Sequence, residues 1–235
     1  MEEYVIILHG ILLGKWHLAN LARYLTKQGY KVINIGYPST KYPLEKLVNI
    51  VAQDITSKLT EIAVNNKSSE YTVNFIGYSM GGLILRAIFN SSNNHHNNDN
   101  NNIIRKNLGK VLLLATPNHG SEVADFFKNN WLYKKIFGPA GRQLTTDQTD
   151  IQHLFTTIDY PLGVIAGNIS LNYFFSKLIN QPNDGKVSIA STKVDGMQDH
   201  ITLPASHTWL PYNKKVQYQT VYFLQHGKFY RTTNG

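Results

Sequence analysis

The chain of 235 residues alternates between two kinds of hydrophobic pattern along its length. Short segments rich in Val, Ile and Leu are separated by longer segments in which apolar residues recur every three or four positions. The short segments are typical of strands buried on both faces, and the longer ones of amphipathic helices. We expect strands at residues 4–9, 31–36, 72–76, 111–115, 162–166 and 201–203.

The clearest helical pattern follows Pro43, a residue that is favoured at the start of helices. Seven apolar residues fall on one face of this segment, namely Leu44, Leu47, Val48, Val51, Ile55, Leu59 and Ile62. Further helices are expected at residues 16–28, 83–88, 122–157 with a break at 138–141, and 216–224. Strands that alternate with helices imply a parallel sheet with right-handed crossovers and helices on both faces.

We therefore expect an α/β fold with a mostly parallel central sheet of about six strands, in one domain over residues 1–235. Residues 92–102 are Asn-rich and polar, which predicts a surface loop that contributes nothing to the core. Two aromatic segments, 117–157 and 168–180, follow strands as short helical insertions that resemble a cap. They either roof an apolar acyl pocket or only cover the edges of the sheet.

A Gly-x-Ser-x-Gly motif at residues 77–81 joins the strand at 72–76 to the helix that follows it. The alternative is an ordinary Gly-rich turn with a capping serine, but the strand–turn–helix context resembles the nucleophile elbow of the α/β-hydrolase superfamily. In such an elbow the turn is too tight for side chains beside the serine. The Ser79 hydroxyl then stands above the sheet at a helix N-terminus, where the dipole favours a developing anion.

A serine hydroxyl needs a histidine as a base, and the histidine needs a carboxylate to orient it. The superfamily order of serine, acid and histidine places both partners downstream of Ser79. Asp184 is the preferred acid, because its turn, NDGKVS, lies beyond the last long strand. Asp195 and Asp199 are the next candidates, and a purely turn-forming role is the other interpretation of Asp184.

His207 is the preferred base, because it follows the short strand at 201–203 and precedes the last helix. His200 would stand at the start of that strand, and His226 at the far end of the chain. After the strand at 111–115, Asn118 and His119 are candidates for contact with substrate.

Several short motifs occur in the order of a compact lipase/esterase-like branch of the superfamily: HG, GYP, GYSMGG, ATPNHGS, NDGKVS and SHTW. By this resemblance the backbone amides of Ile11 and Met80 would form the oxyanion hole, and Gly10 would permit the close approach of the backbone. His9 would brace that loop. The resemblance implies a serine hydrolase that cleaves carboxylic esters with apolar acyl chains through an acyl-enzyme, without a metal or organic cofactor. A thioesterase, an amidase, an acyltransferase and a non-catalytic binding protein remain as alternatives.

The net charge of +8 is spread along the chain without a Lys/Arg block, which argues against nucleic acid as a partner. A solvated basic surface is expected, and it permits peripheral contact with anionic lipid. The chain contains no cysteine, which excludes disulfides and cysteine catalysis and is compatible with a reducing compartment. No apolar run reaches membrane-spanning length, and a strand from about Tyr4 leaves no room for a signal peptide, so we expect a soluble, cytoplasmic protein.

Overall fold

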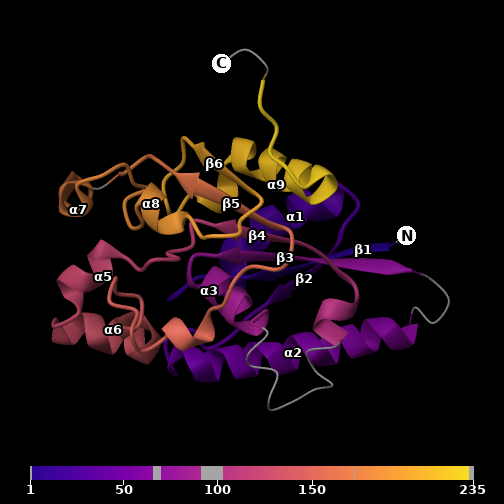
Figure 1. Ribbon diagram of the computed structural model, residues 1–235, viewed down its shortest axis with the longest axis horizontal. Helices are drawn as coiled ribbons and strands as arrows, with labels where there is room; N and C mark the ends of the chain where they lie inside the picture. The colour runs from indigo at the N-terminus through magenta and orange to yellow at the C-terminus, as the bar shows by residue number, and fades with distance from the viewer. Residues whose placement is uncertain (1, 66–69, 91–102, 172, 233–235) are drawn as a thin grey trace.

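A six-stranded sheet in the order β2-β1-β3-β4-β5-β6 forms the centre of the computed structural model, which describes residues 2–65, 70–90, 103–171 and 173–232 (Figure 1). All five pairings between neighbouring strands are parallel. The strands are β1 (Glu2–Leu8), β2 (Lys31–Ile35), β3 (Tyr71–Tyr78), β4 (Leu108–Leu114), β5 (Leu162–Gly167) and β6 (Asp199–Leu203). The predicted strands and the predicted parallel sheet are confirmed, although β1, β4 and β6 begin earlier than expected.

Helices cover both faces of the sheet, as the alternating pattern predicted (Figure 1). The long helices are α1 (Ala19–Lys27), α2 (Leu44–Asn65), α3 (Met80–Ile88) and α9 (Lys214–His226). Successive side chains of a strand point to opposite faces. Ile6 and Leu8 of β1 accordingly lie in a core with α2 and α3, whereas Val5 and Ile7 lie in a second core with α1 and α9.

The pattern that begins at Leu44 predicted α2 closely, because all seven apolar residues of its predicted inner face are buried. The segment 16–28 differs from the prediction. It starts as a 3₁₀ helix, η1 (Lys15–Leu18), before α1 continues it. Short 3₁₀ turns are frequent at helix ends, since the tighter winding still provides acceptors for the first N–H groups.

The first aromatic insertion forms two helices, α5 (Glu122–Phe127) and α6 (Trp131–Arg142). Gly138 interrupts α6 with φ 64° and ψ −163°, which confirms the predicted break. The expectation that the helical segment continues to residue 157 is wrong, because only η3 (Gln152–Leu154) follows. Side chains compete with helical hydrogen bonds there: Thr145 Oγ1 donates to the carbonyl of Asp147, whose carboxylate accepts from the Thr149 amide.

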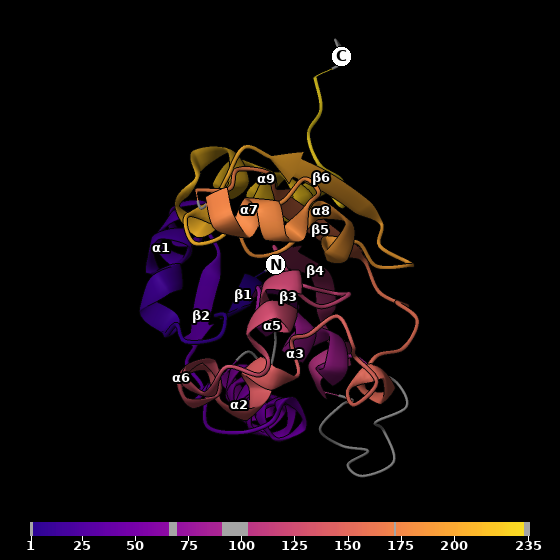
Figure 2. The ribbon, with the colours of Figure 1, turned by 90° about the vertical axis from the view of Figure 1, so that its left-hand side faces the viewer.

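The second aromatic insertion contains α7 (Tyr173–Ile179), and α8 (Ile189–Thr192) and η4 (Leu210–Tyr212) complete the helices used below. Figure 1 shows that the strands run toward the end of the molecule where α5, α6 and α7 lie. Figure 2 looks onto this end, with α5, α6 and α7 in front of the sheet. Within the part of the chain that the structure describes, no helix combines the length and apolar character of a membrane span. The predicted Asn-rich loop at 92–102 lies outside the described residues.

Candidate active site

Ser79 occupies the sharp turn between β3 and α3, with a left-handed φ of 52° and ψ of −124°. Its amide donates to the carbonyl of Leu114 in β4, over 2.8 Å, which anchors the turn to the neighbouring strand. A Cβ atom added at Gly77 would lie 2.4 Å from the Cα of Gly82. One added at Gly81 would lie 2.5 Å from a carbonyl oxygen of β1. Glycine is therefore required on both sides of the serine.

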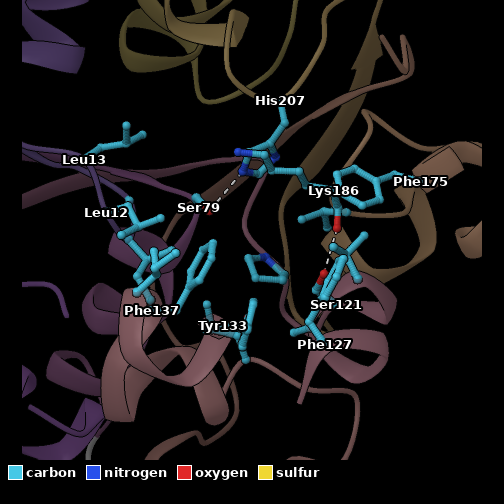
Figure 3. A pocket seen from close by; sticks show the side chains of 18 of the residues that line it. Leu12, Leu13, Ser79, Ser121, Phe127, Tyr133, Phe137, Phe175, Lys186 and His207 are labelled. Atoms are coloured by element: carbon cyan, nitrogen blue, oxygen red, sulfur yellow. Dashed lines mark hydrogen bonds between the residues drawn. The ribbon is translucent and has the colours of Figure 1, made fainter. Parts of the chain in front are cut away.

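Three side chains from distant parts of the sequence form a hydrogen-bonded chain at the carboxyl end of the sheet. His207 Nε2 lies 3.1 Å from Ser79 Oγ, and its Nδ1 lies 2.7 Å from an Oδ of Asp184. All three residues are buried. Figure 3 shows Ser79 and His207 facing each other across one end of a cavity. This arrangement can move a proton from the serine hydroxyl to the imidazole while the carboxylate holds the opposite ring nitrogen.

The Asp184 carboxylate is held by backbone groups on both sides of its turn. Its Oδ1 accepts hydrogen bonds from the amides of Lys186 and Val187, at 3.0 and 2.8 Å. The amide of His207 donates to the Asp184 carbonyl over 2.9 Å. At the end of β5, a Cβ atom on Gly167 would lie 2.9 Å from the Cβ of Asp184, so this glycine lets the turn approach the sheet. Asp184 therefore forms a turn and faces the histidine at the same time.

The other candidate acids and bases lie elsewhere. Asp199 begins β6 at the opposite end of the sheet, where it pairs with Arg231 at 2.7 Å. Asp195 is exposed in the preceding turn. His200 stands within β6, and His226 is exposed at the end of α9. Among the candidates weighed, the structure brings only Asp184 and His207 to Ser79.

His9 braces the loop that follows β1. Its Nε2 accepts a hydrogen bond from the Tyr37 amide at 3.2 Å, and its Nδ1 lies 2.8 Å from the Gly10 carbonyl. The His9 and Tyr37 rings are stacked, with centroids 4.2 Å apart. Burial lowers the pKa of His9, so the neutral ring with its proton on Nδ1 satisfies both hydrogen bonds. This bonding fits the bracing role expected for His9.

The loop at His9–Gly10–Ile11 passes close to the serine. A Cβ atom added at Gly10 would lie 3.0 Å from the Cβ of Ser79, so the missing side chain permits this approach. Ile11 lines the cavity beside Ser79, and Met80 is the first residue of α3. The first N–H groups of a helix have no acceptor within it, so the Met80 amide is available to an oxyanion. The positions of Ile11 and Met80 are compatible with the expected oxyanion hole.

An apolar cavity of about 420 Å³ leads to Ser79 and His207 (Figure 3). This volume lies in the range of small-molecule sites. Its apolar side chains come from the loop after β1, from α5, α6 and α7, and from the segments beside them: Ile11, Leu12, Leu13, Val123, Ala124, Phe127, Leu132, Tyr133, Ile136, Phe137, Leu144, Phe175 and Val187. Phe127 joins the two insertions through ring contacts with Tyr133 and Phe175. The insertions therefore form walls of the cavity, rather than only covering sheet edges.

The residues after β4 are arranged differently from the expectation. Pro117 and Ser121 line the cavity, whereas Asn118 and His119 do not. The Asn118 side chain is committed elsewhere, because it accepts from Arg86 at 3.1 Å and donates to the Thr192 carbonyl at 2.6 Å. His119 is exposed to solvent. We therefore correct the prediction that these two side chains contact substrate.

Lys186 is a lining residue that the sequence reasoning did not single out. Figure 3 shows its side chain beside His207, at the same end of the cavity as Ser79. Burial is the main influence on the Lys186 ammonium and lowers its pKa, while Asp184 acts in the opposite direction. The sequence did contain a signal for Lys186, because this residue stands two positions after Asp184, the predicted acid, in NDGKVS.

Comparisons with known proteins agree with this fold. The sequence model of the palmitoyl protein thioesterase family matches residues 4–150, a span that includes the elbow and Ser79. The lipase BlEst2 of Bacillus licheniformis, in its mature form, aligns with a TM-score of 0.67 at 20% identity, over 96% of this chain and 92% of its own. No curated protein matches the chain in sequence.

Two further solved structures share the fold at low identity. The metagenomic carboxyl esterase MGS0156 aligns with a TM-score of 0.62 at 13% identity, over 88% of this chain and 65% of its own. Phospholipase PlaB of Legionella pneumophila aligns with a TM-score of 0.60 at 18% identity, over 81% of this chain and 45% of its own. The family match covers more than half of the chain and runs through its elbow, and the chain therefore belongs to the palmitoyl protein thioesterase family, within the α/β-hydrolase superfamily.

Proposed function

We propose that this protein is a serine hydrolase that cleaves esters of apolar acyl chains through an acyl-enzyme intermediate. The observation that carries the proposal is the hydrogen-bonded chain of Ser79, His207 and Asp184 at the end of an apolar cavity. The family match and the lipase and esterase neighbours support the same class of hydrolase.

In the first half-reaction, Ser79 Oγ attacks the acyl carbonyl carbon as His207 Nε2 takes the hydroxyl proton. Asp184 keeps the other ring nitrogen protonated and stabilises the imidazolium. The amides of Ile11 and Met80 donate to the oxyanion of the tetrahedral intermediate. When the intermediate collapses, the bond to the leaving group breaks and His207 returns the proton to that group.

In the second half-reaction, a water molecule replaces the serine as the nucleophile. His207 takes a proton from the water as its oxygen attacks the acyl carbon, and the bond to Ser79 Oγ then breaks. The proton returns to Ser79, and the products are the free fatty acid and the regenerated enzyme. Apolar walls favour the acyl chain by about 0.8 kcal/mol for each buried methylene.

Thioesters are the second candidate substrates, and the family description favours them. The acyl-enzyme is the same for an oxygen ester and a thioester, because the alcohol or thiol has already left when the acyl group is bonded to Ser79 Oγ. Only the leaving group differs, and a thiol requires less help from His207 than an alcohol, since the thiolate is the weaker base. The ratio of kcat/KM for an oxygen ester and a thioester of equal acyl length measures this preference.

Labelling with a fluorophosphonate probe tests the proposal directly. We expect covalent labelling of the wild-type protein, loss of labelling in Ser79→Ala, and unchanged labelling in Ser57→Ala, a serine of α2. The same Ser79→Ala variant should lose turnover of both esters and thioesters while its unfolding midpoint stays close to that of the wild type. Labelling of Ser79→Ala as strong as that of the wild type would overturn the assignment of the nucleophile.

A further inference from the structure

Large apolar side chains are exposed on the two insertions that form walls of the cavity. Fourteen such side chains are exposed in the described part of the chain, and eight of them lie on α5, α6 and residues 169–174. We call six of these the apolar rim: Phe126, Trp131, Leu132, Ile136, Leu171 and Phe174. A gathering of this kind on one surface marks an interaction site rather than ordinary scattered exposure.

The helices that carry most of the apolar rim lie on one face of the molecule. Figure 2 looks onto this face and shows α6, α5 and α7 following one another across it. The rings of Phe126 in α5 and Phe174 in α7 are in contact, with centroids 5.5 Å apart. Trp131 and Leu171, from the two insertions, are each 71% exposed. A flat partner could therefore contact both insertions at once.

The apolar rim is continuous with the interior of the cavity. Leu132 and Ile136 line the cavity, yet they remain 48% and 44% exposed. The same two side chains thus belong to the outer surface and to the path toward Ser79. An acyl chain that leaves an apolar phase at the rim can enter the cavity without crossing water, which would cost about 0.8 kcal/mol per methylene.

The three helices α5, α6 and α7 carry more cations than acids. The helices α5, α6 and α7 carry the cations Lys134, Lys135, Arg142 and Lys177, whereas Lys128, in the loop after α5, acts on the nearby Asp147. The acids of these helices are Glu122, which accepts from Gln181, and Asp125, which accepts from Thr146. The three helices therefore carry four cations and two carboxylates, a net charge of +2. Each lysine or arginine near an anionic lipid surface contributes about 1 kcal/mol to binding.

We propose that the apolar rim and its flanking lysines dock on an anionic lipid surface, from which the acyl chain enters the cavity. Exposed tryptophan and leucine together with lysine are typical of segments that lie in a membrane interface. Lysine is depleted at protein–protein interfaces, which makes a protein partner the weaker interpretation. Delivery of the acyl chain rests on the proposed function, whereas docking itself does not.

Sedimentation with vesicles tests the docking without turnover, when it is carried out with the Ser79→Ala protein. We expect binding to vesicles of phosphatidylcholine with phosphatidylserine, weaker binding to phosphatidylcholine alone, and release by salt. Replacing Trp131 and Leu171 together by serine should weaken binding by roughly tenfold or more. Replacing Lys134 and Lys135 together by glutamate should remove the preference for the anionic vesicles.

A matched control replaces two exposed apolar residues away from this face, Val64→Ser with Tyr218→Ser, and should bind vesicles like the parent protein. With Ser79 intact, all three double variants should keep the wild-type unfolding midpoint and turnover of a short, water-soluble ester. Equal vesicle binding by the rim and control variants, or no binding to anionic vesicles, would overturn the proposal. So would a dimer in solution that only the rim variant abolishes, because a second copy would then occupy this face. Loss of fluorophosphonate labelling is a separate result that concerns only the proposed function.

Discussion

At the scale of single residues, Asp184 combines a structural and an electrostatic role by using its two oxygens differently. Oδ1 accepts two backbone amides of its own turn, and Oδ2 faces His207 Nδ1. The turn-forming and acid interpretations of this residue are therefore compatible. The backbone bonds fix the carboxylate, so the histidine ring is oriented by a group that cannot rotate without losing them.

Replacing Asp184 by asparagine makes this arrangement testable. The amide oxygen should keep the two backbone bonds, which turns the NH₂ group toward His207 and favours the tautomer protonated on Nε2. That tautomer cannot accept the Ser79 proton, so we expect kcat to fall by roughly 10³–10⁴-fold. The measurement is steady-state turnover of a soluble ester, beside urea unfolding to check the fold. Asp195→Asn serves as the matched control, and an Asp184→Asn variant with near wild-type kcat would contradict the role.

At the scale of elements, the strand–turn–helix unit formed by β3 and α3 depends on contact with its neighbours. The added Cβ of Gly81 would meet two carbonyl oxygens at the end of β1, those of Leu8 and His9, at 2.5 and 2.6 Å. The elbow and the loop that carries Ile11 are thus packed backbone against backbone. The motif glycines therefore position the loop of Ile11, which we propose to hold the oxyanion, as well as the serine.

Gly81→Ala should disturb both parts of the site together. Because the new methyl group meets backbone rather than a flexible side chain, we expect a loss of about 1–3 kcal/mol in the free energy of unfolding. Fluorophosphonate labelling should also become slower. Gly36→Ala is the control, since its Cβ would lie 3.7 Å from the Lys15 side chain, an ordinary contact. Equal stability and equal labelling rates in the two variants would refute this account of the elbow.

At the scale of the whole molecule, several basic side chains lie close together at the carboxyl end of the sheet, among them His17, His9, His207 and Lys186. The pKa of the buried His17 is lowered to about 4, first by burial and then by the positive charges of His207, Lys186 and His9. Burial also lowers the pKa of His9 and of His200. The folded protein therefore favours neutral histidines at His9 and His17, in the loop after β1 and in η1, and separately at His200, near the start of β6.

The lowered pKa of His17 predicts that acid decreases the free energy of unfolding between pH 6.5 and about 4. Between pH 6.5 and about 4, an unfolded His17 binds a proton that the folded protein excludes, so the free energy of unfolding rises with pH. The stabilisation is complete above pH 6.5 and is lost as the pH falls toward 4, by roughly 3 kcal/mol from His17 alone. Urea unfolding followed by tryptophan fluorescence from pH 4 to pH 8 measures it. His17→Leu should flatten the dependence of the free energy of unfolding on pH, whereas the exposed His226→Leu should not. Equal pH slopes of this free energy in the wild type and both variants would argue against the contribution of His17.

The local patterns of the sequence predicted most of the fold. The seven apolar residues of α2 and the six strands are set by spacing within a few neighbouring residues, which is why they could be recognised. The segment 143–157 was predicted less well, because its threonine and aspartate side chains bond to nearby backbone and compete with the helix. Ser79 could be singled out for a similar reason, since the elbow is a local motif.

What the sequence by itself determined is thus the order of the elements, the elbow, and a short set of acids and histidines around it. Only the tertiary structure decided that Asp184 faces His207, and that Pro117, Ser121 and Lys186 line the cavity instead of Asn118 and His119. It also decided which aromatic residues line the cavity and which remain exposed as the apolar rim. The physical reason is distance along the chain: Ser79 and His207 are 128 residues apart, and the direction of a side chain after a strand depends on what packs against it from elsewhere.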